Sequence, residues 1–238
     1  MSAPESIVTS IRRRLVPIRP EGVPFIAILV FVALFVGWFW QPVLWIGLIL
    51  AAWCAYFFRD PPRVTPIEHG LVVSPADGRV SAVSLGVAPK ELGLGEQMRR
   101  RVSISMGAFD CHVNRAPIEG KIIKTIHRSG SLLGADLDKS SERHERNSLV
   151  IEAAQGPVGV VQIAGFVARR IVCLCREGEI VATGQRIGFI RFGSRVDVYL
   201  PVAAAVTVAE GQTAVAGETA IARFGLDQSG AQRRVRID

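Results

Sequence analysis

The longest uncharged stretch of the sequence constrains the fold most. No charged residue occurs from Val23 to Phe58, a run of 36 residues. Gln41 and Pro42 divide it into two apolar halves, 24–40 and 43–58, and each is close to the roughly 17 residues at which a helix begins to span a bilayer. Pro42 cannot continue a helix without loss of a backbone hydrogen bond, so it marks a turn. The run therefore predicts a membrane-embedded helical hairpin over residues 23–58.

Basic residues on both sides of the run set its expected orientation. Arginines occur at Arg12, Arg13, Arg14 and Arg19 in the N-terminal segment 1–22, and at Arg59 and Arg63 after the run. Because Lys and Arg concentrate on the cytoplasmic side, both ends of the hairpin, and the domain that follows, are expected on the cytoplasmic side of the cell membrane. A cleaved signal peptide and a buried hairpin of a soluble protein are the alternatives.

The net charge of the chain points to the same surface. A formal charge of +7 favours an anionic membrane as partner. Nucleic acid is not expected as a partner, because the sequence has neither zinc-finger spacing nor an aromatic-rich RNA-binding signature.

The apolar pattern changes to a period of two after a proline-containing linker, residues 59–70. Strands are expected at 71–74, 80–85, 102–106, 118–127, 148–153, 158–164, 167–175, 186–192 and 195–200, with further short strands within 210–224. Residues 92–100 and 132–146 are expected to form loops or short helices. The predicted fold of residues 71–238 is thus mostly β, a sandwich or partly open barrel with few short helices.

The four cysteines do not form a disulfide framework and are expected to be reduced thiols. Cys173 and Cys175 alternate along an expected strand and so share one face. A metal site made of Cys111, His112, Cys173 and Cys175 lacks a paired C-x-x-C spacing, and no metal site is predicted.

Gly193 and Ser194 separate two of the expected strands. A glycine within a strand pattern often marks a bulge, a bend or a close backbone approach. The hydroxyl of Ser194 follows the carbonyl of Gly193, which carries no Cβ to hinder attack. If the bend strains the peptide, the serine oxygen can convert the amide into an ester, and elimination followed by hydrolysis would leave a pyruvoyl group. An ordinary Gly-Ser turn is the alternative from these two residues alone.

Other polar residues are candidates only in combination. Asp77 lies in the turn Ser74–Gly78, and His112 lies in the polar segment Ala108–Pro117. Taken singly, such an Asp is a turn former and such a His is a solvated loop residue. With Ser194 they match the logic of a Ser-His-Asp site, although no G-x-S-x-G elbow, P-loop or H-E-x-x-H motif is present.

Six motifs in one order resemble the phosphatidylserine decarboxylase family, in its short (type A) form with a membrane hairpin. They are Tyr56–Pro61, Ser74–Gly78, Asp110–Pro117, Glu145–Asn147, Val161–Gly165 and Phe192–Arg195. The resemblance extends from the basic N-terminus to about Phe224. It implies a carboxy-lyase that converts phosphatidylserine into phosphatidylethanolamine and carbon dioxide in phospholipid biosynthesis.

The resemblance also implies a self-cleaved enzyme. Scission between Gly193 and Ser194 would give a β chain, 1–193, and an α chain, 194–238, which stay together as a heterodimer. Residue 194 would become a pyruvoyl group, so that no free cofactor is needed. The family pattern gives Asp77 a part in self-cleavage and His112 a part in decarboxylation.

One position departs from the family pattern. Longer members carry a second histidine where this chain has Arg115, and a guanidinium does not act as a base near neutral pH. Arg115, Arg146 and Asn147 are secondary candidates for substrate binding.

The chemistry is consistent with the resemblance. A pyruvoyl carbonyl can form a Schiff base with the amine of phosphatidylserine and accept the electrons released with carbon dioxide, and an imidazole can return the proton. Two alternatives are a membrane-tethered β-domain that only binds and a serine hydrolase that acts on lipids and keeps Ser194 intact.

Overall fold

The computed structural model describes residues 16–129, 145–165, 170–191 and 194–225. Contacts divide the chain into two compact units, Met1–Pro62 and Arg63–Asp238.

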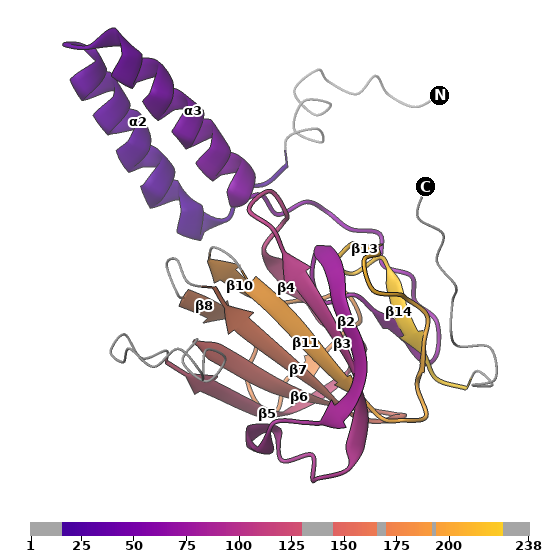
Figure 1. The fold of residues 1–238 in the computed structure, drawn as a ribbon. Coiled ribbons are helices and arrows are strands. Elements are labelled where there is room, and N and C mark those ends of the chain that lie inside the picture. Colours follow the sequence, from indigo (N-terminus) through magenta and orange to yellow (C-terminus); the bar gives the residue numbers. More distant parts are fainter. Residues whose placement is uncertain (1–15, 130–144, 166–169, 192–193, 226–238) are drawn as a thin grey trace, which may run out of the picture. The chain divides into compact units, whose positions relative to one another are not determined.

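The first unit contains a short 3-10 turn, η1 (Pro20–Gly22), and two helices, α2 (Val23–Gly37) and α3 (Gln41–Phe57), that pack as a hairpin (Figure 1). Small residues let the two backbones approach. A Cβ on Gly47 would lie 2.5 Å from the Cβ of Ala33, and one on Gly37 would lie 2.6 Å from the Cβ of Leu44. The helical hairpin predicted from the uncharged run is confirmed.

The apolar side chains of this unit lie mostly on its surface. Phe31, Phe35 and Trp38 are exposed, and the stretch Pro20–Gly37 is long and apolar enough to cross a membrane. The turn lies before Pro42 rather than at it, because this proline occupies the first turn of α3, where no intrahelical N–H donor is needed.

The second unit is built from β-strands. Their bounds are β1 (Leu71–Val73), β2 (Gly78–Val87), β3 (Met98–Met106), β4 (Val113–Arg115), β5 (Gly120–Arg128), β6 (Arg146–Ala153), β7 (Gly156–Ala164), β8 (Arg170–Cys173), β9 (Ile180–Val181), β10 (Arg186–Arg191), β11 (Ser194–Leu200), β12 (Ala205–Val206), β13 (Thr213–Ala214) and β14 (Ala220–Arg223). A 3-10 turn, η2 (Lys90–Leu92), follows β2.

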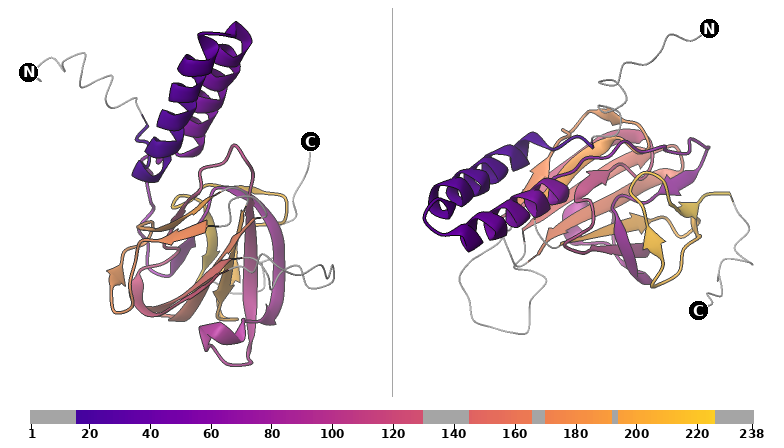
Figure 2. Two further views of the ribbon diagram at one scale, coloured as in Figure 1. Left: turned by 90° about the vertical axis from the view of Figure 1, so that its left-hand side faces the viewer. Right: turned by 90° about the horizontal axis from the view of Figure 1, so that it is seen from above.

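Among the described residues these strands form three antiparallel sheets. The largest has the order β13-β2-β3-β11-β7-β6-β5-β9 and curls into a half-barrel (Figure 2). Two three-stranded sheets have the orders β4-β10-β8 and β1-β14-β12. One buried cluster joins all three sheets, with Ile104 and Val160 from the large sheet, Ile187 and Ile190 from β10, and Ile221 from β14. The predicted mostly β fold is therefore confirmed.

Two local expectations were wrong. Met98–Arg100 were expected in a loop, but they extend β3 and pair with the end of β2. The Arg99–Arg101 run looks like a loop in sequence, yet Arg99 is buried and donates from Nη1 to the carbonyl of Pro157 at 2.8 Å. Val113–Arg115 were read as part of a polar loop, but they form β4 against β10. Most of the expected loop 132–146 lies outside the described residues.

Candidate active site

The candidate site lies at one end of the curled sheet, where β2 begins, β3 ends and β11 begins. The backbone of Ser194 pairs with Met106 of β3 on one side and with Ala164 of β7 on the other. Gly193 and the side chain of Ser194 lie outside the part of the chain that the structure describes. Position 194 is thus held between two neighbouring strands.

The turn that carries Asp77 packs against the same end of β3. Gly78 has a φ of +140°, and a Cβ at this position would lie 2.1 Å from the carbonyl oxygen of Ser105 and 3.2 Å from Cα of Met106. Only glycine allows this approach, which explains the Asp-Gly pair. Since β3 separates β2 from β11, the backbones near Asp77 and Ser194 are two strand spacings apart, about 10 Å.

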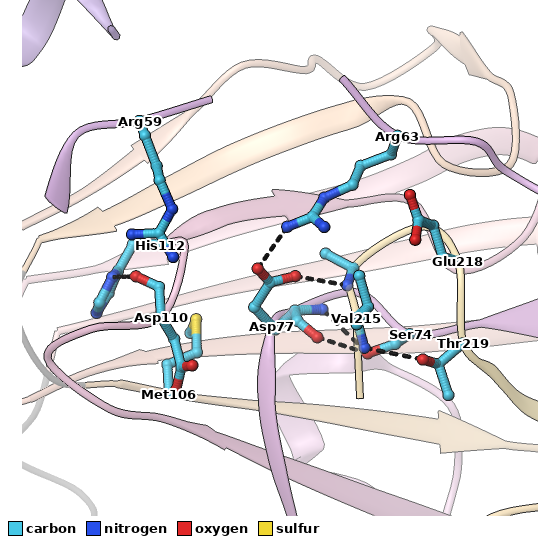
Figure 3. Close-up of polar contacts among 12 residues, drawn as sticks. Arg59, Arg63, Ser74, Asp77, Met106, Asp110, His112, Val215, Glu218 and Thr219 are labelled. Atoms are coloured by element: carbon cyan, nitrogen blue, oxygen red, sulfur yellow. Dashed lines mark hydrogen bonds and ion pairs between the residues drawn. The ribbon is translucent and has the colours of Figure 1, made fainter. Parts of the chain in front are cut away.

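Asp77 is a nearly buried carboxylate with fixed partners (Figure 3). Arg63 forms an ion pair with it, with Nη2 2.5 Å from Oδ2, and the backbone N–H of Ala216 donates to Oδ1 at 2.7 Å. The side chains of Arg63 and Asp77 are only 16% and 12% exposed. Charge-assisted hydrogen bonds of this kind favour an ionised, oriented carboxylate. Sequence reasoning assigned Arg63 only to the basic flank of the hairpin and so missed this role.

Backbone hydrogen bonds tie the Asp77 turn to the chain that follows Ser194. The amide of Ser74 donates to the carbonyl of Thr219, and the amide of Gly217 donates to the carbonyl of Ser74, both at 2.8 Å. The hydroxyl of Thr219 in turn accepts from the amide of Val215 at 2.9 Å. These contacts fix the loop that supplies the Ala216 donor, and Figure 3 shows the one between Val215 and Thr219.

His112 ends the loop that leaves β3 after Met106, and its side chain is fully buried. Its Nδ1 lies 3.0 Å from the carbonyl oxygen of Asp110. Because a carbonyl only accepts, Nδ1 is the protonated nitrogen and the neutral ring offers Nε2 as its basic atom. The carboxylate of Asp110 accepts from the amide of Gly107 at 2.7 Å and so braces the loop. The reading of His112 as a solvated loop residue is wrong.

The loop is also anchored to the strand that leads toward Ser194. The carbonyl of His112 accepts a hydrogen bond from the amide of Ile190 in β10 at 3.2 Å. The sheet order therefore brings three chemistry-bearing segments to one end of the unit: the Asp77 turn, the His112 loop and the start of β11.

A model of the phosphatidylserine decarboxylase family matches residues 50–222. The matched region includes Asp77, His112 and Ser194. The chain belongs to the phosphatidylserine decarboxylase family. Members of this family are carboxy-lyases of phospholipid biosynthesis. Membership in the family supports decarboxylation of phosphatidylserine as the reaction of this chain.

The remaining predicted residues, Arg115, Arg146 and Asn147, lie on strands β4 and β6. Arg115 is buried and donates from Nη1 to the carbonyl of Gly184 at 3.0 Å. Arg146, at the start of β6, is half-buried, whereas its neighbour Asn147 is fully buried.

Asn147 belongs to a chain of buried amides that sequence reasoning missed. Its Nδ2 donates to Oε1 of Gln162 at 2.7 Å, and Nε2 of Gln162 donates to Oδ1 of Asn114 at 2.7 Å. Nδ2 of Asn114 reaches Sδ of Met106 at 3.8 Å. This amide chain, Asn147–Gln162–Asn114, links β6 and β7 to β4 and ends beside the strand position opposite Ser194. A Cβ on Gly188 would lie 2.6 Å from Nε2 of Gln162, so β10 also makes room for it.

Within the described ranges, no group of three or more His, Cys, Asp or Glu side chains is arranged to hold a metal ion. A hollow lined by Val87, Lys90, Gly93, Gly95 and Glu96 lies at the far end of β2. At about 3.3 Å per strand residue, this hollow is roughly 30 Å from Asp77 and separate from the candidate site.

Proposed function

We propose that this chain decarboxylates phosphatidylserine with a pyruvoyl group made from its own Ser194, after self-cleavage of the Gly193–Ser194 bond. The observation that carries the proposal is the meeting of the Asp77 turn, the His112 loop and the backbone of Ser194 at one end of one sheet. A pyruvoyl group supplies a carbonyl that condenses with the substrate amine and accepts the electron pair left by carbon dioxide.

The described residues fit such a group. A reactive carbonyl at the first residue of a chain needs a fixed position, and β3 and β7 pair with position 194 from both sides. It also needs a proton donor within a site shielded from water, and the buried His112 lies on the loop that begins next to Met106, opposite position 194.

Asp77 is proposed to assist the cleavage step. The Ser194 hydroxyl attacks the Gly193 carbonyl and the C–N bond breaks, which gives an ester and the free amine of Ser194. Loss of the Ser194 α-proton and of the Gly193 carboxylate then leaves a C=C bond, and water adds to the tautomeric imine as ammonia leaves, which gives the carbonyl. Protons must leave Ser194 during this sequence, and Asp77 is the proposed acceptor. Its orientation by Arg63 and by the Ala216 N–H supports the role, since both contacts favour the ionised form.

His112 is proposed to return the proton during decarboxylation. With Nδ1 held by the Asp110 carbonyl, Nε2 first takes up a proton from the substrate ammonium group and then delivers it to the α-carbon. Burial of the imidazole keeps bulk water from competing for this step. Arg115, Arg146 and Asn147 remain candidates for recognition of the substrate head group.

The two chains are proposed to remain one heterodimer after cleavage. β11 pairs with β3 over seven residues and with β7 over six, so the α chain contributes an interior strand of the sheet. β14 pairs with β1 as well. An interior strand with ladders on both sides does not leave the sheet without unfolding it.

The hairpin, residues 23–58, is proposed to embed in the cell membrane and to tether residues 71–238 on its cytoplasmic side. Its exposed apolar side chains and the arginines on either side support this placement. A tethered enzyme meets its lipid substrate in two dimensions, and the basic character of the chain suits the anionic surface that phosphatidylserine provides.

The test compares the wild-type chain with Ser194→Ala and, as a matched control, with Ser105→Ala on the neighbouring strand β3. Wild type and Ser105→Ala should each give two chains, of 193 and 45 residues, and release carbon dioxide from phosphatidylserine vesicles. Ser194→Ala should stay intact and inactive. A wild-type chain that decarboxylates while intact overturns the proposal. An intact, inactive chain that reacts with a fluorophosphonate at Ser194 would indicate a serine hydrolase instead, and one that does neither would indicate a binding domain.

A further inference from the structure

Two thiols lie in contact at the end of β8, next to Asn147, one of the candidates for head-group recognition. The Sγ atoms of Cys173 and Cys175 are 3.7 Å apart, and Sγ of Cys173 lies 3.2 Å from the carbonyl oxygen of Cys175. Cys173 is half-buried, whereas Cys175 is buried and its thiol lies 3.5 Å from the carbonyl of Ile187. One thiol of the pair is thus accessible to small reagents and the other is held directly behind it.

The surroundings of Cys173 favour its thiolate. The hydrogen bond between the two thiols, a contact with Asn147 and the nearby His127 lower the pKa of Cys173 to about 6, against the opposing effect of burial. The same hydrogen bond, together with burial, raises the pKa of Cys175. Among the described residues, charged groups near the pair include His127 of β5, Glu145, which lies 3.2 Å from His127, and Glu179 near Cys175.

We propose that Cys173 and Cys175 form an oxidation site, in which Cys173 attacks a peroxide and Cys175 resolves the product as a disulfide. In the first step the Cys173 thiolate bonds to one peroxide oxygen, the O–O bond breaks, and hydroxide leaves and takes up a proton. In the second step the sulfur of Cys175 attacks the sulfenic sulfur, the S–O bond breaks, and water leaves with the proton of Cys175. Overall, two thiols and one hydrogen peroxide give one disulfide and two waters.

The geometry suits the second step. The sulfurs are already in van der Waals contact, so bond formation requires them to close from 3.7 Å to about 2.05 Å. Residues two apart on a fully extended segment lie about 6.6 Å apart, and a disulfide needs Cβ atoms about 3.8 Å apart, so closure bends the chain just after Cys173, where β8 ends. Cys173 also contacts Asn147, the first member of the amide chain that ends at Met106, so the site adjoins the interior of the catalytic domain.

The test uses the full-length protein and one tryptic peptide. Arg170 and Arg176 bracket the segment Ile171–Arg176, so a single peptide carries both thiols. After treatment with hydrogen peroxide and blocking of free thiols, this peptide should lose two hydrogens, about 2 Da, and should not take up the blocking reagent. The Cys111 peptide of the same sample measures general oxidation and should react more slowly, since Cys111 is buried.

Two variants separate the roles of Cys175. Cys175→Ser keeps a hydroxyl that can donate to the Cys173 thiolate but cannot form a disulfide, so Cys173 should stay reactive and accumulate as sulfenic acid, trapped by dimedone. Cys175→Ala removes both functions. At about pH 5.5, Cys173 is roughly one-quarter thiolate with a pKa near 6, but only about 0.03% thiolate with an ordinary pKa of 9.0.

The two thiolate fractions differ about 800-fold, and the lower intrinsic nucleophilicity of the low-pKa thiolate offsets about twentyfold of this difference, so iodoacetamide should label wild-type Cys173 up to about fortyfold faster than Cys173 of Cys175→Ala. Equal labelling rates of these two proteins would overturn the proposal. So would peroxide treatment that oxidises the Cys111 peptide while Cys173 and Cys175 remain free thiols.

Discussion

The ion pair between Arg63 and Asp77 offers the sharpest test of the site geometry, because sequence reasoning did not foresee it. A double-mutant cycle with Arg63→Gln and Asp77→Asn isolates their coupling. Asp77→Asn keeps the shape of the side chain and still offers an oxygen to the Ala216 N–H, whereas Arg63→Gln removes the charge and shortens the side chain. All four proteins should carry Ser194→Ala as well, so that self-cleavage does not change the species under study.

The structure sets the expected size of the coupling. At the 2.5 Å separation of Nη2 and Oδ2, the gross attraction is about 7 kcal/mol for an effective dielectric constant near 20. Desolvation and side-chain ordering offset most of this. Exposed pairs couple by less than about 1 kcal/mol, whereas removal of one partner from a fully buried pair costs about 3–5 kcal/mol. With exposures of 16% and 12%, the coupling free energy should be about 2 kcal/mol, because this pair lies between those cases.

The assay is thermal and urea unfolding of the four full-length proteins in one detergent. For a domain of this size, a change of about 1 kcal/mol in stability shifts the melting temperature by about 2–4 °C, so each single variant should melt about 4–8 °C below the parent. The double variant should melt well above the temperature expected if the two single decreases simply added. A coupling below about 0.5 kcal/mol would refute the reasoning, because it would mean that Arg63 does not hold Asp77. In chains that keep Ser194 and can cleave, Arg63→Gln should accumulate uncleaved precursor. Arg63→Lys should accumulate less of it, since lysine keeps the charge but not the planar donors.

Three further predictions concern other parts of the molecule. His112→Ala should still give two chains, but it should lower the turnover of phosphatidylserine by about 10²- to 10⁴-fold in a carbon dioxide release assay, because a single cleavage tolerates a slow step and turnover does not; a chain that stays uncleaved would make His112 part of the cleavage machinery. Gln162→Leu should lower the free energy of unfolding by about 2–4 kcal/mol, since it leaves the buried Asn114 and Asn147 amides without their partner. The control Gln155→Leu, at a half-buried position in the turn between β6 and β7, should change the free energy of unfolding by less than about 0.5 kcal/mol. Similar losses for both variants would show that the amide chain does not stabilise the fold. Deletion of residues 1–58 should release the β-domain from vesicles in a flotation assay without preventing cleavage, and a truncated chain that fails to cleave would place the hairpin within the folding unit.

Much of the fold follows from two simple patterns. The uncharged run specified the hairpin because 36 residues without a charge leave few other structures. Alternation of apolar residues specified β2, whose first residues are buried and exposed in turn, whereas β6 and β7 are buried on both faces and show as nearly continuous runs. The short strand β4 escaped because three residues show no periodicity, and its polar side chains, Asn114 and Arg115, are buried by tertiary contacts rather than by pattern.

The site could be suspected from the sequence but not assembled from it. Asp77, His112 and Ser194 are far apart in the chain, and only the strand order β2-β3-β11 brings the Asp77 turn near the start of β11. Arg63 looks like a membrane-flanking charge, because nothing local distinguishes an arginine that pairs with a carboxylate 14 residues later. Gln162 and Asn147 stand at inward positions of strands, where a polar residue signals a buried hydrogen-bond partner. That signal was present in the sequence, but it does not say which partner.

The mass of the small chain tests the central claim most directly. Purified wild-type protein should contain a fragment of about 5 kDa that begins at position 194, and its mass should be lower than that of the serine-initiated peptide 194–238 by one ammonia, about 17 Da, because a carbonyl replaces the amine. The same fragment should resist stepwise N-terminal sequencing. A fragment with the full mass of a serine-initiated chain, from a preparation that decarboxylates phosphatidylserine, would contradict the account.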